Sequence, residues 1–168
     1  MTEYDSASED VRARYDDQTA RHGRITNMKR TMLHSPKVFD VYMEWYALRD
    51  KLAEFIGNRA VSLYSYAISS GTDCLICSTF FRKILIDSGD DPDNPALSAT
   101  ERFLMEFGRA IAKNSHDIPR ELYDYLHKSF SEEQQVLLIG FAGMMVATNL
   151  FNTVAKVPLD EVLYQYTK

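Results

Sequence analysis

An uncharged segment of about 20 residues, Val136 to Ala155, constrains the fold of this chain more than any other feature. Ser131 and Gln134 precede it at the spacing of a capping box, which predicts a helix start. Its length fits a membrane span, but two glycines and two asparagines interrupt it. Because the segment is apolar almost all round, we interpret it as a helix at the centre of the domain or shared between subunits.

The remaining segments predict further helices. Ser35 and Pro36 are a typical helix start, and apolar residues then recur at helical spacing until Gly57. Ser98 and Glu101 form a second capping box. Other helices are expected at 59–69, from the cysteines to before Gly89, and at 120–128, with a last short element from Pro158. No window alternates like a strand, so the fold class is all-α, in one domain of 168 residues.

Charge and composition limit the classes of partner and the cellular location that the sequence predicts. The net charge of −5 and the pI of about 5.4 argue against a nucleic-acid surface. The acidic amino terminus lacks the apolar region of a signal peptide, so we expect a cytoplasmic protein that binds no membrane. Residues 1–27 are polar and predict a loose or helical arm, or a segment that orders on a neighbouring subunit. Residues 28–168 form the helical domain.

The two cysteines, Cys74 and Cys77, form a C-x-x-C pair. Thr72 and Asp73 are good N-cap residues, which predicts that both cysteines lie in the first turn of a helix. A helix N-terminus favours the thiolate, and positions three apart share a face, so redox chemistry is the favoured interpretation. Two small core residues or half of a metal site are the alternatives. The four histidines are scattered and no second cysteine pair exists, so no metal and no cofactor are predicted.

Four polar residues are candidate auxiliaries of the pair. Ser62, Tyr66 and Ser69 share one face of the helix before the cysteines and could donate hydrogen bonds toward the sulfurs. A packing face is the alternative, which the pattern favours. His34 precedes the Ser35 cap and could approach the site, although an exposed loop histidine is the favoured interpretation.

The chain resembles the alkylhydroperoxidase D-like, carboxymuconolactone decarboxylase superfamily over roughly residues 28 to 157. The resemblance is carried by "AVSLYSYAISSGTDCLICSTFFRKILIDSG", "ALSATERFLMEFGRAIAK" and "SFSEEQQVLLIGFAGMMVATNLFNTVAKV". It implies an all-helical fold and a homo-oligomer. It also implies reduction of a small peroxide or disulfide, with Cys77 as the attacking thiol, Cys74 as its disulfide partner and another dithiol as the reductant.

Two positions depart from the family pattern. The thiol-active branch has a histidine four residues after the second cysteine and a glutamate about twelve before the first. Phe81 and Ser62 stand there in this chain. The alternative function is therefore a degenerate, non-catalytic member that binds a small molecule or a partner.

Overall fold

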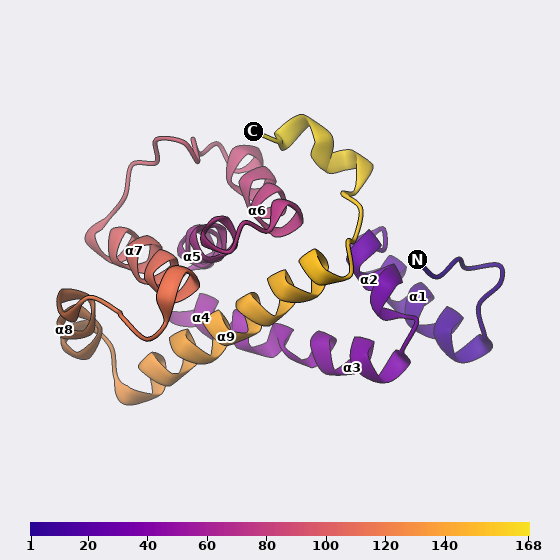
Figure 1. Ribbon diagram of the computed structural model, residues 1–168, viewed down its shortest axis with the longest axis horizontal. Helices are drawn as coiled ribbons and strands as arrows, with labels where there is room; N and C mark the ends of the chain where they lie inside the picture. The colour runs from indigo at the N-terminus through magenta and orange to yellow at the C-terminus, as the bar shows by residue number, and fades with distance from the viewer.

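The structure is a computed structural model of residues 1–168, and it contains helices and no strand. The all-α prediction is confirmed (Figure 1). The elements in chain order are α1 (Glu9–His22), α2 (Asn27–Met32), α3 (Pro36–Glu44), α4 (Tyr46–Ile56), α5 (Asn58–Gly71), α6 (Leu75–Asp87), α7 (Ala99–Asn114), α8 (Arg120–Ser129), α9 (Glu132–Val154) and the 3₁₀ helix η1 (Glu161–Tyr166).

Both predicted capping boxes are present. The Ser98 hydroxyl accepts from the Glu101 backbone and the Glu101 carboxylate accepts from the Ser98 backbone, which starts α7. Ser131 and Gln134 make the same reciprocal pair at the start of α9. Each box satisfies two backbone groups that a helix end leaves without partners, so these starts are set locally.

One predicted helix is two helices in the structure. The apolar spacing from Pro36 to Gly57 predicts a continuous helix, but the chain bends at Trp45 between α3 and α4. There the Leu48 N–H donates to the Trp45 carbonyl, a tighter i to i+3 bond of 3.0 Å. The Trp45 ring packs on Tyr42, whose ring in turn packs on Phe151 of α9. Apolar spacing alone does not report such a bend, because the spacing continues across it.

The main core surrounds α5, which packs on α6 and α7 and lies between them in Figure 1. Tyr64 of α5 is fully buried, and its ring stacks on Phe107 of α7 and Phe141 of α9. Its hydroxyl donates to the Leu138 carbonyl at 3.2 Å. The buried aromatic therefore has a hydrogen-bond partner, as buried tyrosines usually do.

Helix α9 runs diagonally across the molecule and is buried on one face only (Figure 1). It is long and apolar enough to cross a membrane by length and composition, and 33% of its most apolar window is buried inside the chain. The buried face carries Leu138, Phe141, Ala142, Met145, Asn149 and Asn152.

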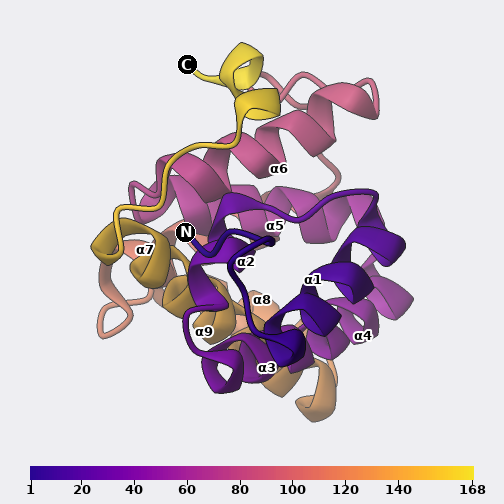
Figure 2. The same cartoon turned by 90° about the vertical axis from the view of Figure 1, so that its right-hand side faces the viewer.

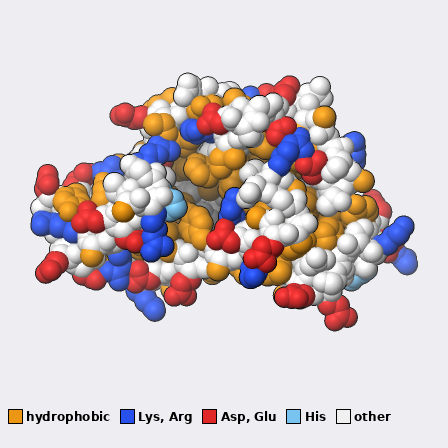
Figure 3. Space-filling view, turned by 180° about the vertical axis from the view of Figure 1, so that it is seen from behind, with side chains coloured by type: hydrophobic (Ala, Val, Ile, Leu, Met, Phe, Trp, Pro, Cys, Tyr) orange, Lys and Arg blue, Asp and Glu red, His pale blue; other side chains and the backbone are white.

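The amino-terminal arm is helical over α1 and packs on α2 and α3, as Figure 2 shows. Val11 of α1 joins Met32, Leu33 and Phe39 in a small apolar cluster of its own. On the face opposite to that of Figure 1, the molecular surface is hollowed in the middle, and hydrophobic side chains are visible in the hollow (Figure 3).

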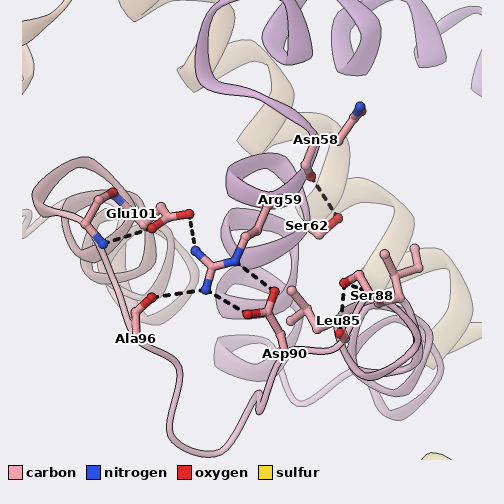
Figure 4. A network of polar contacts seen from close by, with 10 residues as sticks. Asn58, Arg59, Ser62, Leu85, Ser88, Asp90, Ala96 and Glu101 are labelled. Atoms are coloured by element: carbon pink, nitrogen blue, oxygen red, sulfur yellow. Dashed lines mark hydrogen bonds and ion pairs between the residues drawn. The ribbon is translucent and has the colours of Figure 1, made fainter.

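An ion-pair network fixes the start of α5 against the loop that follows α6 (Figure 4). The Arg59 guanidinium donates to both carboxylate oxygens of Asp90 at 2.8 Å, to Glu101, and to the Ala96 carbonyl at 3.1 Å. These bonds join the ends of three segments and so limit the movement of α6 relative to α5 and α7.

Candidate redox site

The turn between α5 and α6 brings the cysteines under α9. Gly71 ends α5 close to α7, where an added Cβ would lie 2.7 Å from the Ala112 Cβ, so only glycine allows this approach. Asp73 then has φ of 53°, in the left-handed region that aspartate tolerates better than most residues. The Cys74 N–H donates back to the Ser69 carbonyl at 3.1 Å, which closes the turn.

The sequence places both cysteines inside the first turn of α6, but Cys74 is itself the N-cap residue. Its φ of −84° and ψ of 98° are extended, as an N-cap requires, and its carbonyl accepts from Ser78. Cys77 is the third helical residue and faces the same side. Thr72 and Asp73 belong to the preceding turn. Both cysteines are free thiols and buried, with 2% and 7% of their surfaces exposed.

The two thiols act as one ionising unit. The hydrogen bond from the Cys77 thiol lowers the pKa of Cys74 to about 6, and the backbone amides of Cys77 and Ile76 and the Thr153 hydroxyl act in the same direction. Burial of the Cys74 thiol opposes this shift. The pKa of Cys77 is raised, first by its bond to Cys74 and then by burial. Cys74 is therefore the more acidic thiol of the pair and Cys77 the less acidic one.

The side-chain amide of Asn152, on α9, contacts Cys77. Its nitrogen donates to the Cys77 sulfur at 3.1 Å and to the Met28 sulfur of α2 at 3.4 Å. Its oxygen is buried and has no hydrogen-bond partner within the chain. Met28 of α2 is thus linked to Cys77 through the Asn152 amide.

A second buried amide, Asn149, lies one turn earlier on α9. Its nitrogen donates to the Thr72 hydroxyl at 2.8 Å, and its oxygen accepts from the Ser69 hydroxyl at 3.5 Å. The Thr72 hydroxyl donates to backbone carbonyls at the end of α5. This chain of bonds holds the turn before Cys74 against α9.

The other residues named from the sequence lie in different surroundings. The Ser62 hydroxyl donates to the Asn58 carbonyl at 3.0 Å, and Tyr66 packs in a cluster with Leu63 and Leu85. His34 is exposed and its side chain makes no hydrogen bond within the chain. Ser69 alone among them is linked to the turn of the cysteines, through Asn149.

Phe81, which stands at the family's histidine position, packs against both core clusters around α5. Two surface depressions, of about 270 and 580 Å³, lie between α7 and α8 and between α1 and α3, and neither is lined by a cysteine. No group of three or more histidine, cysteine, aspartate or glutamate side chains is placed to hold a metal ion.

Sequence reasoning missed Asn152, Thr153 and Met28. The signal that was present is the pair of asparagines in an otherwise apolar helix, since a buried amide needs hydrogen-bond partners. Nothing local indicates that those partners include a cysteine 75 positions away.

No family model matches the chain, and no curated protein matches it. A solved structure is similar to it: the alkylhydroperoxidase AhpD core of an uncharacterized peroxidase-related protein from Ralstonia eutropha JMP134. The two share 17% sequence identity with a TM-score of 0.71, over 96% of this chain and 91% of that one. At this identity the likeness concerns the fold. The chain therefore has the all-helical AhpD-like fold.

Proposed function

We propose that this chain is a thiol-dependent oxidoreductase that reduces a peroxide through Cys74 and Cys77. The observation that carries the proposal is the pair itself: two free thiols lie together at the start of α6, and an amide nitrogen donates to the second sulfur. A thiol with a pKa of about 6 is about 90% ionised at pH 7, against about 3% for an ordinary cysteine. The fold it shares with a peroxidase-related protein agrees with this chemistry.

The reaction balances with the groups of the pair. The Cys74 thiolate attacks the terminal oxygen of a hydroperoxide, an S–O bond forms and the O–O bond breaks. Cys77 gives its proton to the departing alkoxide, which leaves as an alcohol. Cys74, now a sulfenic acid, is attacked by the Cys77 thiolate. The disulfide forms, and the expelled hydroxide takes a proton from solvent and leaves as water. An external dithiol then reduces the disulfide.

This assignment reverses the roles that the family resemblance implies. The resemblance gives the attack to Cys77, whereas the N-cap position and its donors favour the thiolate on Cys74. It also needs no separate proton relay. Ser62 and Phe81, at the family's glutamate and histidine positions, are bonded to backbone and packed in the core respectively. Cys77 supplies the proton instead, as a positioned acid next to the reacting sulfur.

Single-cysteine variants test the proposal. With hydrogen peroxide and dimedone, C77S is expected to accumulate a dimedone adduct on Cys74, and C74S to react more slowly. The native chain is expected to form the disulfide within one subunit and to consume peroxide when a dithiol is supplied. An adduct on Cys77 alone would restore the family assignment. No reaction in any form would contradict the oxidoreductase.

The second candidate function is a non-catalytic member that binds a small molecule or a partner. The burial of both sulfurs favours it, because a peroxide must reach a sulfur to be reduced. The same experiment separates the two candidates, since a sealed pair gives neither an adduct nor a disulfide until the chain unfolds.

A further inference from the structure

Only the nitrogen of the Asn152 side-chain amide makes hydrogen bonds within the chain. The residue is 2% exposed, its nitrogen donates to the sulfurs of Cys77 and Met28, and its oxygen has no partner. Buried polar groups in folded proteins are nearly always hydrogen-bonded, so a lone acceptor beside two reactive thiols calls for an explanation.

The orientation of this amide follows from its neighbours. A methionine sulfur carries no proton and can only accept a hydrogen bond. The amide group that faces Met28 must therefore be the nitrogen, and the oxygen points to the other side. The lone acceptor thus lies on an amide whose nitrogen is 3.1 Å from the Cys77 sulfur.

We propose that the side-chain oxygen of Asn152 accepts a hydrogen bond from the hydroxyl of a hydroperoxide and holds its terminal oxygen against the cysteine pair. The inference rests on the proposed function and adds the residue that positions the substrate. The peroxide lies across the two sulfurs, with its terminal oxygen at Cys74 and its leaving oxygen at Cys77. The hydroxyl proton stays on the terminal oxygen as it becomes the sulfenic acid, so the bond to Asn152 persists through the step.

This role makes Asn152 selective for electrophiles with a hydroxyl. The amide nitrogen on Cys77 influences the pair toward every electrophile alike. The amide oxygen helps only a reagent that can donate to it. A hydroperoxide has an O–H group, and methyl methanethiolsulfonate, a small thiol reagent, has none. Only the peroxide uses the Cys77 proton, so both rates are measured in a C77S background. There the ratio of the two rates reports on the oxygen and cancels changes in the ionisation of Cys74.

The experiment compares N152L with the native Asn152, with N152A as a second variant in case the leucine is not accommodated. Rates with tert-butyl hydroperoxide and with methyl methanethiolsulfonate are measured on the reduced proteins in the C77S background. The peroxide-to-thiosulfonate ratio is expected to fall at least about tenfold in either variant, the usual scale for one lost hydrogen bond to a charged or reacting group. S65A is the control, because Ser65 is a fully buried polar residue whose hydroxyl bonds to the Val61 carbonyl within α5, and its ratio is expected to stay native.

Each other outcome overturns the inference. An equal loss with both reagents means that Asn152 acts only on the sulfur. Unchanged rates with both reagents mean that the Asn152 oxygen makes no hydrogen bond to the peroxide. If neither variant folds, the native ratio is compared with that of N-acetylcysteine, and a ratio no higher than the free thiol's excludes positioning. A native chain that reacts with the thiosulfonate but with no peroxide refutes the proposed function itself.

Discussion

The Cys77 sulfur accepts a hydrogen bond of 3.1 Å from the side-chain nitrogen of Asn152, across 75 positions of sequence. The bond joins the first turn of α6 to the last turns of α9. Because Asn152 donates to Met28 as well, the same amide connects Cys77 to α2. A change at Asn152 is therefore expected to affect both the surroundings of Cys77 and the packing of α2.

The first prediction concerns ionisation of the pair. The pKa of Cys74 is lowered to about 6. Ionisation of this thiol is therefore nearly complete at pH 7, and the thiolate is lost as the pH falls through 6. Alkylation by iodoacetamide is expected to reach half its maximal rate near pH 6 and to map to Cys74. In C77A the donating side chain is removed, so the midpoint is expected to move up toward the ordinary value of about 8.5. Rates that rise only above pH 8 in the native chain would contradict the lowered pKa of Cys74.

The second prediction concerns access past Met28. Both sulfurs are buried, and Met28 accepts a hydrogen bond from the amide that also bonds Cys77, so we expect reagents to enter when α2 moves. M28A removes the side chain that packs on Asn152 and is expected to lower the free energy of this local opening by about 1.4 kcal/mol. The alkylation rate should then rise about tenfold. Met43 packs in the same apolar cluster and makes no bond to Asn152, so M43A is the control. Equal rates in the two variants would show that reagents enter by another route.

The third prediction concerns Lys29, whose ammonium is buried. It donates to the Gln18 oxygen and lies 5.2 Å from the centre of the Tyr46 ring. Burial lowers the pKa of Lys29 to about 8 from 10.5, while Asp17 opposes the shift. Between these values the unfolded chain binds more protons than the folded one, so Lys29 makes stability rise with pH across this window.

The measurement is the free energy of unfolding in urea, in the native chain and in K29M, from pH 7.5 to 10.5. The native-minus-variant difference is expected to grow by up to about 3 kcal/mol, at about 1.4 kcal/mol per pKa unit. The same substitution at the exposed Lys37 is the control. A difference that stays constant with pH would show that the ammonium is solvated.

The fourth prediction concerns Arg59. Hydrogen bonds to charged groups contribute about 1.5–3 kcal/mol, but this side chain is 37% exposed and solvent screens it. R59M is therefore expected to lower the free energy of unfolding by about 1–2 kcal/mol. R49M removes a more exposed arginine on α4, bonded to Asp50 and Asn58, and is expected to change stability by no more than about 0.5 kcal/mol. Equal effects would show that the network of Figure 4 adds nothing beyond a surface pair.

The fold was predictable where its causes are local. Capping pairs such as Ser98 with Glu101 satisfy the helix end from within four residues, and the structure has those helix starts. The bend at Trp45 was not predictable, because it coincides with ring packing against α9, which the spacing does not encode. Thr72 was expected to cap α6, but its hydroxyl is bonded to the end of α5 and to Asn149.

The candidate site was predictable in its cysteines and not in its surroundings. Cys74 and Cys77 are three apart, so one helix turn brings them together whatever the rest of the chain does. Asn152 reaches Cys77, and Met28 reaches Asn152, only because of how α9 and α2 pack, at separations of 75 and 124 residues. A resemblance to relatives with a histidine and a glutamate directs attention to Phe81 and Ser62, where neither residue has a group free to act.

The last prediction concerns the outer face of α9, which no other part of the chain covers. Val136, Ile139, Leu150 and Val154 are 69%, 51%, 62% and 72% exposed, and the exposed glycines 140 and 143 lie between them. The spacing of these residues places them along one side of the helix. Single exposed apolar residues are common, but a continuous stripe of this kind marks an interface.

We expect a homo-oligomer in which two copies bury this stripe, with more than about 1,000 Å² per contact. A carboxylate placed in such a contact loses its hydration without gaining a partner, so L150E is expected to raise the dissociation constant at least about 30-fold, or about 2 kcal/mol. V162E, on an exposed valine of η1, is the control and is expected to associate like the native chain. Sedimentation velocity of the native chain, L150E and V162E is measured from about 0.1 to about 50 µM, the range in which stable contacts persist. A native monomer at micromolar concentration would contradict self-association. If that monomer sediments with phospholipid vesicles, the stripe binds a membrane instead, since the helix is long enough to span one.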